Sequence, residues 1–314
     1  MVIFITGGAG FIGSHLCERL LKDGKEVIAV DDFNDFYDPE RKKKNIRDFL
    51  KNKKFKVYKE DIRDKDRIKK IFENNKIEVI VHLAARAGIR PSMENPLLYI
   101  DVNVNGTLAM LELAKEFNIK KFIFASSSSV YGSNEKIPFS EDDAINNPLS
   151  PYAITKIAGE QLCRIYSKLY GIDIICLRFF TVYGPRGRPD MAPYKFTNLI
   201  MKNKEIEVYG DGSSKRDYTF ISDIIDGVAA AIEKELKFEV INLGDSNPVE
   251  LKYLIKLIEK NTGKKAKIKL MPEQKGDVPI TYADISKAKR LLGYTPKVKI
   301  EEGVKRLVEW HKNG

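Results

Sequence analysis

Short apolar runs alternate with longer amphipathic stretches along the first 180 residues of the chain. Six of the runs are predicted to be buried strands: Val2–Thr6, Glu26–Val30, Phe55–Lys59, Ile77–Leu83, Phe122–Ser126 and Ile172–Arg178. The stretches between them are longer and repeat apolar residues at helical spacing, as in Ile12–Lys22. Because strands that alternate with helices build βαβ units, the pattern predicts an α/β fold around a parallel sheet.

Two of the predicted helices carry clear signals at their ends. Asn95–Pro96 supplies a candidate N-cap and a proline at the first helical position, and this helix is expected to end near Phe117. Ser150–Pro151 supplies the same signals for a second long helix, which Gly171 is expected to terminate.

The character of the chain changes after Arg178. The segment TVYGPRGRPDMAP, residues 181–193, is dense in Gly, Pro and Arg and is predicted to be a loop between domains. Beyond it we expect a strand and five helices: Ile206–Tyr209, then Tyr194–Lys202, Asp223–Glu235, Leu251–Asn261, Ser286–Leu292 and Ile300–Lys312. A length of 314 residues suits two domains, which we place at 1–180, rejoined by part of 217–246, and at 181–314.

The 54 Lys and Arg residues exceed the 44 Asp and Glu residues, which gives a net charge of +10. Such an excess is typical of proteins that bind nucleic acids, anionic membranes or anionic substrates. The sequence has no zinc-finger spacing, helix-turn-helix signal or RNP-like aromatic pattern, so no nucleic-acid partner is expected. The Lys-rich pieces 41–45 and 51–54, which include Lys42–Lys44, are expected to form a solvated helix face, with an interaction patch as the alternative.

Other classes are excluded by the apolar runs and by the cysteines and histidines. No apolar run approaches the ~18–20 residues that span a bilayer, and the N-terminus lacks the features of a signal peptide. The three cysteines are widely spaced and there are only three histidines, so neither a disulfide framework nor a metal site is expected. We therefore expect a cytoplasmic protein with no membrane partner.

A glycine-rich segment joins the first predicted strand to the first predicted helix. It reads GGAGFIG, with Gly7, Gly10 and Gly13 at its turns and Phe11 and Ile12 between the last two. Glycines allow a tight turn and let backbone N–H groups approach a pyrophosphate at the helix N-terminus. The segment therefore predicts a dinucleotide-binding turn, although a similar turn also occurs where a helix merely packs on a strand.

Acidic residues follow the next two predicted strands. Asp31 ends the second strand, 18 residues after Gly13, where a carboxylate accepts hydrogen bonds from an adenosine ribose and repels a 2′-phosphate. This favours NAD over NADP. Asp61 and Ile62 follow the third strand and are candidate contacts to the adenine, or an ordinary turn at a strand end.

Tyr152 and Lys156 are four residues apart near the start of a predicted helix and therefore share one face. An ammonium beside a phenol favours the phenolate, so Lys156 would lower the pKa of Tyr152 and make it a usable base. Ser127 ends the fifth predicted strand, where the ligand clefts of parallel sheets open, and would orient the reacting hydroxyl. The Tyr–Lys pair alone is common on helix surfaces, and Ser127 is what favours a catalytic set.

Together, the glycine-rich turn, Ser127, Tyr152 and Lys156 resemble the extended short-chain dehydrogenases/reductases over essentially the whole chain. The resemblance implies a Rossmann domain with a doubly wound parallel sheet that binds NAD, and a smaller C-terminal α/β domain that binds a nucleotide-linked sugar. It also implies a homodimer formed through the two capped helices. Further cofactor-binding residues that it implies are Leu83, Ala84, Ala85 and Asn103.

The same resemblance narrows the reaction. Nucleotide-sugar 4,6-dehydratases carry Asp and Glu where this chain has Ser128 and Ser129, and those acidic residues move protons at C6 of the sugar. A 4-epimerase needs no such acids, because C4 passes a hydride to NAD and receives it back on the other face. NAD is regenerated in each cycle, so a tightly bound cofactor is implied.

Residues 178–192 resemble UDP-glucuronate 4-epimerases more than UDP-glucose 4-epimerases, which generally carry Asn at the position of Thr181. The C5 carboxylate of glucuronate requires neutral donors or a guanidinium group. Ser127, Ser128 and Thr181 are the candidate hydroxyl donors, and Arg188 is the candidate guanidinium. The expected reaction is therefore conversion of UDP-glucuronate to UDP-galacturonate.

Four further residues are candidate substrate contacts. Arg216 matches the position used for the UDP diphosphate in the family, with a surface ion pair as the alternative. Tyr209 is a candidate to stack on the uracil or to fill the core at a strand end. Arg90 is a candidate for the cleft, or for pairing at a helix end or between subunits. Asp277 lies in a segment, 276–294, that resembles the terminal region of the family.

Several alternatives remain open. A UDP-glucose or UDP-N-acetylglucosamine 4-epimerase shares the same catalytic set. A UDP-sugar decarboxylase usually carries an acidic residue where this chain has Ser129. A non-catalytic NAD-binding regulator commonly loses the tyrosine that this chain retains as Tyr152.

Overall fold

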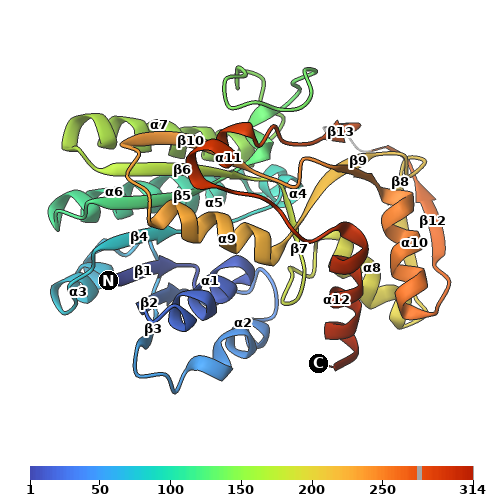
Figure 1. The fold of residues 1–314 in the computed structure, drawn as a ribbon, viewed down its shortest axis with the longest axis horizontal. Helices are drawn as coiled ribbons and strands as arrows, with labels where there is room; N and C mark the ends of the chain where they lie inside the picture. Colours follow the sequence, from blue (N-terminus) through green and yellow to red (C-terminus); the bar gives the residue numbers. More distant parts are fainter. Residues whose placement is uncertain (274–277, 314) are drawn as a thin grey trace. The chain divides into compact units, whose positions relative to one another are not determined.

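The computed structural model describes residues 1–273 and 278–313, which form two compact units (Figure 1). The first unit comprises three stretches of chain: Met1–Asn134, Asp143–Phe179 and Ile225–Ile241. The second unit comprises the remaining stretches: Glu135–Asp142, Phe180–Ile224 and the chain from Asn242 onward.

The first unit is built on a seven-stranded sheet in the order β10-β6-β5-β4-β1-β2-β3. Its strands are β1 Val2–Thr6, β2 Glu26–Asp31, β3 Phe55–Lys59, β4 Val79–His82, β5 Lys121–Ser127, β6 Asp173–Phe179 and β10 Phe238–Leu243. Strands β1 to β6 pair in parallel, and the order reverses between β1 and β4, as in doubly wound Rossmann folds. The predicted α/β fold is confirmed, and all six predicted strands begin and end within two residues of the observed ones.

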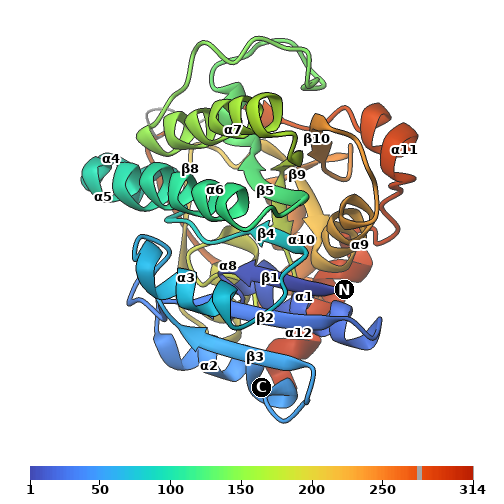
Figure 2. The ribbon, with the colours of Figure 1, turned by 90° about the vertical axis from the view of Figure 1, so that its left-hand side faces the viewer.

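Helices cover both faces of this sheet. The helical segments are α1 Phe11–Lys22, α2 Pro39–Ile46, η1 Arg47–Phe49, α3 Lys65–Glu73, α4 Ile89–Glu94, α5 Pro96–Tyr99, η2 Ile100–Asn105, α6 Gly106–Glu116, η3 Ser128–Tyr131, α7 Pro151–Tyr170 and α9 Ile221–Ile232. Helices α3, α6 and α7 lie on one face, and α1 and α9 lie on the other (Figure 2). Phe4, Phe122 and Phe124 form the centre of the core beneath α3, α6 and α7.

The two capped helices begin where the sequence predicts. The Asn95 side chain accepts a hydrogen bond from the Leu98 nitrogen, and the Ser150 side chain accepts one from the Ala153 nitrogen. Gly171 ends α7 in the left-handed conformation. The helix that begins at Pro96 differs from the prediction in one respect, because its middle, η2, is a π-helical segment.

The second unit contains small sheets and four helices among its described residues. Its strands are β7 Thr181–Tyr183, β8 Glu205–Tyr209, β9 Lys215–Phe220, β11 Pro248–Glu250, β12 Lys267–Met271 and β13 Ile280–Thr281, and its helices are α8 Ala192–Met201, α10 Leu251–Thr262, α11 Ser286–Leu292 and α12 Ile300–Asn313. Strand β9 pairs with β7, β11 and β13, and β8 pairs with β12. The sequence pattern predicts β8 and all four helices but misses the other strands, because short strands are determined by partners that are distant in sequence.

The Lys-rich piece 51–54 is not helical. It forms a turn between η1 and β3, and Lys51, Lys53 and Lys54 are exposed as expected. The prediction of a helix there is wrong because the chain must turn to enter β3, which pairs with β2 from Val27 onward.

Over residues 1–273 and 278–313, no helix is long and apolar enough to cross a membrane. The same residues contain no group of three or more His, Cys, Asp or Glu side chains arranged to hold a metal ion. Cys17, Cys163 and Cys176 are buried and not joined by disulfides.

Candidate active site and cofactor cradle

The glycine-rich segment forms the turn between β1 and α1. Gly7 has a φ of 70°, and a side-chain carbon there would lie 2.9 Å from the Ala84 nitrogen. A side-chain carbon at Gly13 would lie 2.1 Å from the Gly7 carbonyl oxygen. Within the described part of the chain, no side chain caps the start of α1 at Gly10. The turn therefore leaves backbone N–H groups at a helix N-terminus, which is the donor set that fits a dinucleotide pyrophosphate.

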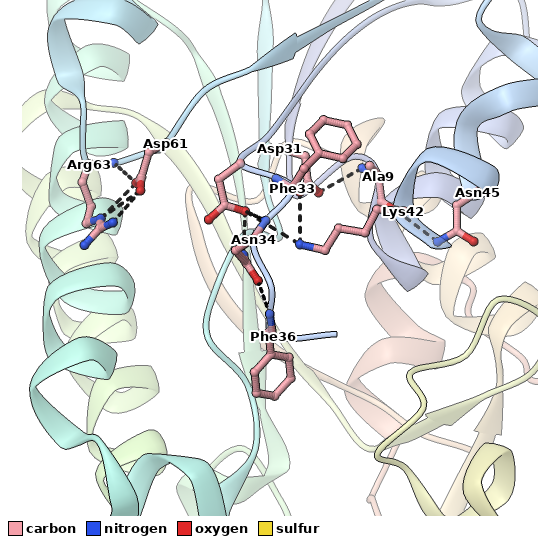
Figure 3. Close-up of polar contacts among 10 residues, drawn as sticks. Ala9, Asp31, Phe33, Asn34, Phe36, Lys42, Asn45, Asp61 and Arg63 are labelled. Atoms are coloured by element: carbon pink, nitrogen blue, oxygen red, sulfur yellow. Dashed lines mark hydrogen bonds and ion pairs between the residues drawn. The ribbon is translucent and has the colours of Figure 1, made fainter. Parts of the chain in front are cut away.

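Asp31 lies at the end of β2 and is 6% exposed. Its Oδ2 accepts a hydrogen bond from the Ala9 nitrogen at 3.2 Å, and its Oδ1 accepts one from the Phe33 nitrogen at 2.9 Å (Figure 3). Burial raises the pKa of the Asp31 carboxyl, and the Lys42 ammonium opposes this rise. The carboxylate is thus held against the glycine-rich turn, where a ribose contact is predicted.

The prediction that Lys42 belongs to a solvated helix face is wrong. Lys42 is 5% exposed, and its Nζ lies 3.4 Å from Asp31 Oδ1 and 3.8 Å from an Asp32 carboxylate oxygen (Figure 3). Helix α2 contacts α1, and Asn45 donates a hydrogen bond to the Ala9 carbonyl at 3.1 Å. This packing turns the Lys42 side of α2 toward β2, a contact that the local sequence does not reveal.

Asp61 and Ile62 follow β3, and their side chains have partners within the protein. The Arg63 guanidinium donates to Asp61 through Nε at 3.0 Å and through a second nitrogen at 2.6 Å (Figure 3). These hydrogen bonds hold the pKa of the Asp61 carboxyl below its usual range. Ile62 is 5% exposed and lies so close to Gly106 that a side-chain carbon there would come within 2.5 Å of its Cδ1. An adenine contact by either residue stays a prediction.

The segment after β4 is held by β1 and by the π-helical segment. The Ala84 nitrogen donates to Thr6 Oγ1 at 3.1 Å, and the Leu83 nitrogen donates to the Thr6 carbonyl. Asn103 accepts a hydrogen bond from the Arg86 nitrogen at 2.7 Å and donates one to the Arg86 carbonyl at 2.9 Å. Residues 83–86 therefore lie beside the glycine-rich turn, where the resemblance implies that Leu83, Ala84 and Ala85 contact the cofactor.

Tyr152 and Lys156 lie on the first two turns of α7, and the Lys156 Nζ is 6.0 Å from the centre of the Tyr152 ring. The Nζ donates a hydrogen bond to the Ala125 carbonyl of β5 at 2.7 Å and lies 5.0 Å from the Phe124 ring centre. Burial lowers the pKa of Lys156 to about 8. The structure thus confirms that Tyr152 and Lys156 are neighbours and places Lys156 in a desolvated position.

Ser127 ends β5, two residues beyond the carbonyl that binds Lys156. Its Oγ accepts a hydrogen bond from the Ser129 nitrogen and donates one to Ser129 Oγ, both at 3.1 Å. Ser128 begins the short segment η3 and is partly exposed. The serine run therefore presents hydroxyl groups, and no acidic side chain, at the carboxyl end of β5.

Sequence reasoning missed a buried network next to this set. Arg178 donates to both carboxylate oxygens of Glu160, at 2.9 and 2.8 Å, and Ser126 Oγ donates to the same carboxylate at 2.5 Å. All three side chains are at most 3% exposed. The only sequence signal is that Glu160 follows Lys156 by one helical turn on a face that must be buried. The network fixes α7 to the ends of β5 and β6.

The remaining substrate candidates lie on several elements. Arg90 is on α4 in the first unit and is exposed. In the second unit, Thr181 begins β7, and Arg188 donates to Asp190 through Nε at 3.1 Å and through a terminal nitrogen at 2.5 Å. Tyr209 ends β8, and Arg216 on β9 donates to the Lys215 carbonyl. Asp277 lies outside the described residues.

Comparison with known proteins identifies the family to which the chain belongs. The family described as GDP-mannose 4,6 dehydratase matches residues 4–307. A UDP-glucuronate 4-epimerase of Thermodesulfobacterium geofontis is 48% identical, over 98% of this chain and 95% of its own length.

Two solved structures are similar over the full chain. The UDP-glucuronic acid 4-epimerase from Bacillus cereus, in complex with UDP-glucuronic acid and NAD, has a TM-score of 0.94 at 39% identity and covers 100% of this chain and 99% of its own. The UDP-glucose 4-epimerase from Thermotoga maritima, with UDP-glucose, has a TM-score of 0.92 at 34% identity with the same coverage. The chain therefore belongs to the GDP-mannose 4,6 dehydratase family of extended short-chain dehydrogenases/reductases.

Proposed function

We propose that the protein is an NAD-dependent UDP-sugar 4-epimerase that interconverts UDP-glucuronate and UDP-galacturonate. The observation that carries this proposal is the pairing of Tyr152 with the buried Lys156 at the end of β5, where the neighbouring serines supply no acid. The likeness to epimerases over the full length of the chain supports it.

The catalytic residues have separate roles. Bound NAD supplies a reversible hydride acceptor for C4 of the sugar. Tyr152 removes the proton of the 4-hydroxyl group and returns it at the end of the cycle, and Ser127 orients that hydroxyl group. The Lys156 ammonium stabilises the phenolate form of Tyr152, because an adjacent positive charge lowers the pKa of a phenol.

The cofactor is proposed to bind to the first unit. Its pyrophosphate would contact the turn containing Gly7, Gly10, Phe11, Ile12 and Gly13, and its ribose would contact Asp31. Because Lys42 is paired with Asp31, its ammonium would lie beside the bound ribose as well. The remaining candidate cofactor contacts are Asp61, Ile62, Leu83, Ala84, Ala85 and Asn103.

A dehydratase reaction is not favoured, although the matching family is described by one. Such chemistry at C6 needs an acid and a base, and Ser128 and Ser129 offer only hydroxyl groups. Epimerisation requires proton transfer only at the 4-hydroxyl group, and Tyr152 would carry it out.

Glucuronate is the proposed sugar because hydroxyl donors and a guanidinium suit a C5 carboxylate. Thr181 and Ser128 would supply the hydroxyl groups, and Arg188, now paired with Asp190, would supply the positive charge. UDP-glucose is the second candidate, supported by the Thermotoga maritima relative.

The second unit is proposed to bind the UDP-sugar, with Arg216 at the diphosphate and Tyr209 at the uracil. The protein is also proposed to be a cytoplasmic homodimer.

The test is to incubate the protein with UDP-glucuronate, UDP-glucose or UDP-N-acetylglucosamine without added NAD, and to follow the anomeric and H4 NMR signals. We expect UDP-galacturonate to form from UDP-glucuronate without CO₂ release, and Tyr152→Phe to abolish this conversion. Turnover of the neutral sugars alone would overturn the choice of substrate. No turnover of any UDP-sugar would overturn the epimerase itself.

A further inference from the structure

A chain of buried hydrogen bonds passes through His82, at the end of β4, and no catalytic role accounts for it. Thr6 Oγ1 lies 2.7 Å from His82 Nδ1, and His82 Nε2 lies 3.0 Å from Thr107 Oγ1. The three side chains are at most 1% exposed. Buried polar groups without partners are costly, so each bond in the chain constrains its neighbours.

The donor and acceptor of each hydrogen bond follow from the groups at the two ends of the series, the Asn103 carbonyl and the Ala84 N–H. Thr107 Oγ1 lies 2.5 Å from the Asn103 carbonyl, which can only accept, so the Thr107 hydroxyl donates there and accepts from His82. His82 therefore carries its proton on Nε2. Its Nδ1 then accepts from the Thr6 hydroxyl, whose oxygen in turn accepts from the Ala84 nitrogen at 3.1 Å. Burial, reinforced by the Lys156 ammonium, lowers the pKa of His82 to about 3 and keeps the ring neutral.

The series of hydrogen bonds continues from Asn103 to α7, the helix that carries Tyr152 and Lys156. Asn103 Nδ2 donates to Thr155 Oγ1 at 3.0 Å, and Thr155 Oγ1 donates to the Tyr152 carbonyl at 2.7 Å. Asn103 lies in the π-helical segment η2, an irregularity that frequently marks functional sites. Both amide hydrogens of Asn103 are committed, to Arg86 and to Thr155.

Packing links the same two regions a second time. The His82 ring stacks on Phe124, with ring centres 6.0 Å apart and planes at 27°. The Lys156 ammonium also lies against Phe124, 5.0 Å from its ring centre. A side-chain carbon at Gly159 would lie 2.3 Å from Phe124, so α7 packs directly on this ring.

We propose that His82, held as the Nε2–H tautomer, is a positioning residue that fixes the first turn of α7, and with it Tyr152 and Lys156, relative to the strand ends that hold the cofactor turn. This role rests on the proposed epimerase. Asn103 acts in it as the connection between His82 and α7. Each hydrogen bond in this series has one possible donor, so removing any one donor interrupts the series.

The tautomer is tested without activity. In a two-bond ¹H–¹⁵N correlation spectrum of the whole protein, His82 is expected to show the Nε2–H pattern at pH 8 and to keep it at pH 5.5, with His15 and His311 as internal references. An Nδ1–H pattern, or an imidazolium signal at pH 5.5, would overturn the proposal. This measurement holds whether or not the protein proves to be an epimerase.

The positioning role is tested with Thr107→Val, which removes the hydroxyl group and keeps the volume. We expect kcat to fall about 10- to 100-fold with KM changed less than about threefold, because a small misplacement of catalytic groups costs rate more than binding. The lower limb of the kcat–pH profile should also move to higher pH, since a displaced Lys156 stabilises the phenolate less. Thr107→Ser, which restores the hydroxyl group, should recover most of the rate.

The matched control is Thr197→Val on α8. Thr197 is also fully buried and also donates to the carbonyl four residues earlier, Pro193, but it has no link to His82 or α7 among the described contacts. Its variant should lose similar stability and keep kcat within about twofold of the wild type. Equal losses of kcat in the two variants, or a Thr107→Val enzyme with wild-type kcat and pH profile, would overturn the proposal.

Discussion

Two lysines of the first unit are equally buried and have opposite surroundings. Lys42 and Lys156 are each 5% exposed. The Lys42 ammonium faces the Asp31 carboxylate at 3.4 Å, whereas the Lys156 ammonium donates to the neutral carbonyl of Ala125 at 2.7 Å. No carboxylate oxygen of residues 1–273 or 278–313 lies within 4.0 Å of the Lys156 Nζ.

Under the proposed function, burial would serve cofactor binding at Lys42 and catalysis at Lys156. In a buried ion pair such as Asp31–Lys42, the attraction between the two charges offsets part of their desolvation within the protein. The Lys156 ammonium has no carboxylate in direct contact, and the nearest acidic residue acting on it, Glu160, is already bound by Arg178. A desolvated ammonium in this position favours an anion as its next partner. In the proposed reaction that anion is the Tyr152 phenolate.

Removing the Lys156 charge, which has no carboxylate in direct contact, should have the largest effect. Lys156→Met should lower kcat about 10³-fold, because a desolvated charge beside a developing anion contributes several kcal/mol to the transition state. The measurement is the NMR assay of UDP-glucuronate conversion, with the fold of the variant checked by circular dichroism. A folded variant that keeps more than a tenth of the wild-type kcat would show that Lys156 does not stabilise the phenolate.

Removing the paired charge should instead affect stability. Lys42→Met leaves the Asp31 carboxylate buried without its cation, and we expect the free energy of unfolding to fall by about 3 kcal/mol in urea denaturation. Asp31→Asn in the same chain should restore much of that loss. The control is Lys43→Met, one residue along, where the exposed pair with Glu40 should contribute less than about 1 kcal/mol. Equal losses in the two lysine variants would show that the Asp31–Lys42 pair is not special.

Much of the first unit could be predicted because its signals are local. Apolar runs mark β1 to β6, and the caps at Asn95 and Ser150 fix the starts of two helices. The glycine-rich turn and the pair Tyr152–Lys156 were also visible, since each lies within a few residues of sequence. The turn and the pair are expected to lie near each other because the carboxyl ends of parallel strands meet at one edge of the sheet.

The parts that could not be predicted depend on distant partners. Lys42, Lys43 and Lys44 are indistinguishable in sequence, and only the packing of α2 decides which of them meets Asp31. The carboxylate of Glu160 and the guanidinium of Arg178 are 18 residues apart and meet through two different elements. The tautomer of His82 likewise follows from partners 25 and 76 residues away.

The smallest expected effect concerns pH and distinguishes the buried Lys156 from the exposed Lys43. The pKa of Lys156 is about 8 in the folded protein and about 10.4 in an unfolded chain, so between these values the unfolded chain binds more protons at this site. Stability contributed by this residue therefore rises with pH across that window. Measured by urea denaturation without added NAD, wild type should gain about 1.5 kcal/mol relative to Lys156→Met between pH 8 and pH 9.5. The same comparison for Lys43→Met should show no such gain, and a flat difference for Lys156→Met would mean that the ammonium is not desolvated in the folded protein.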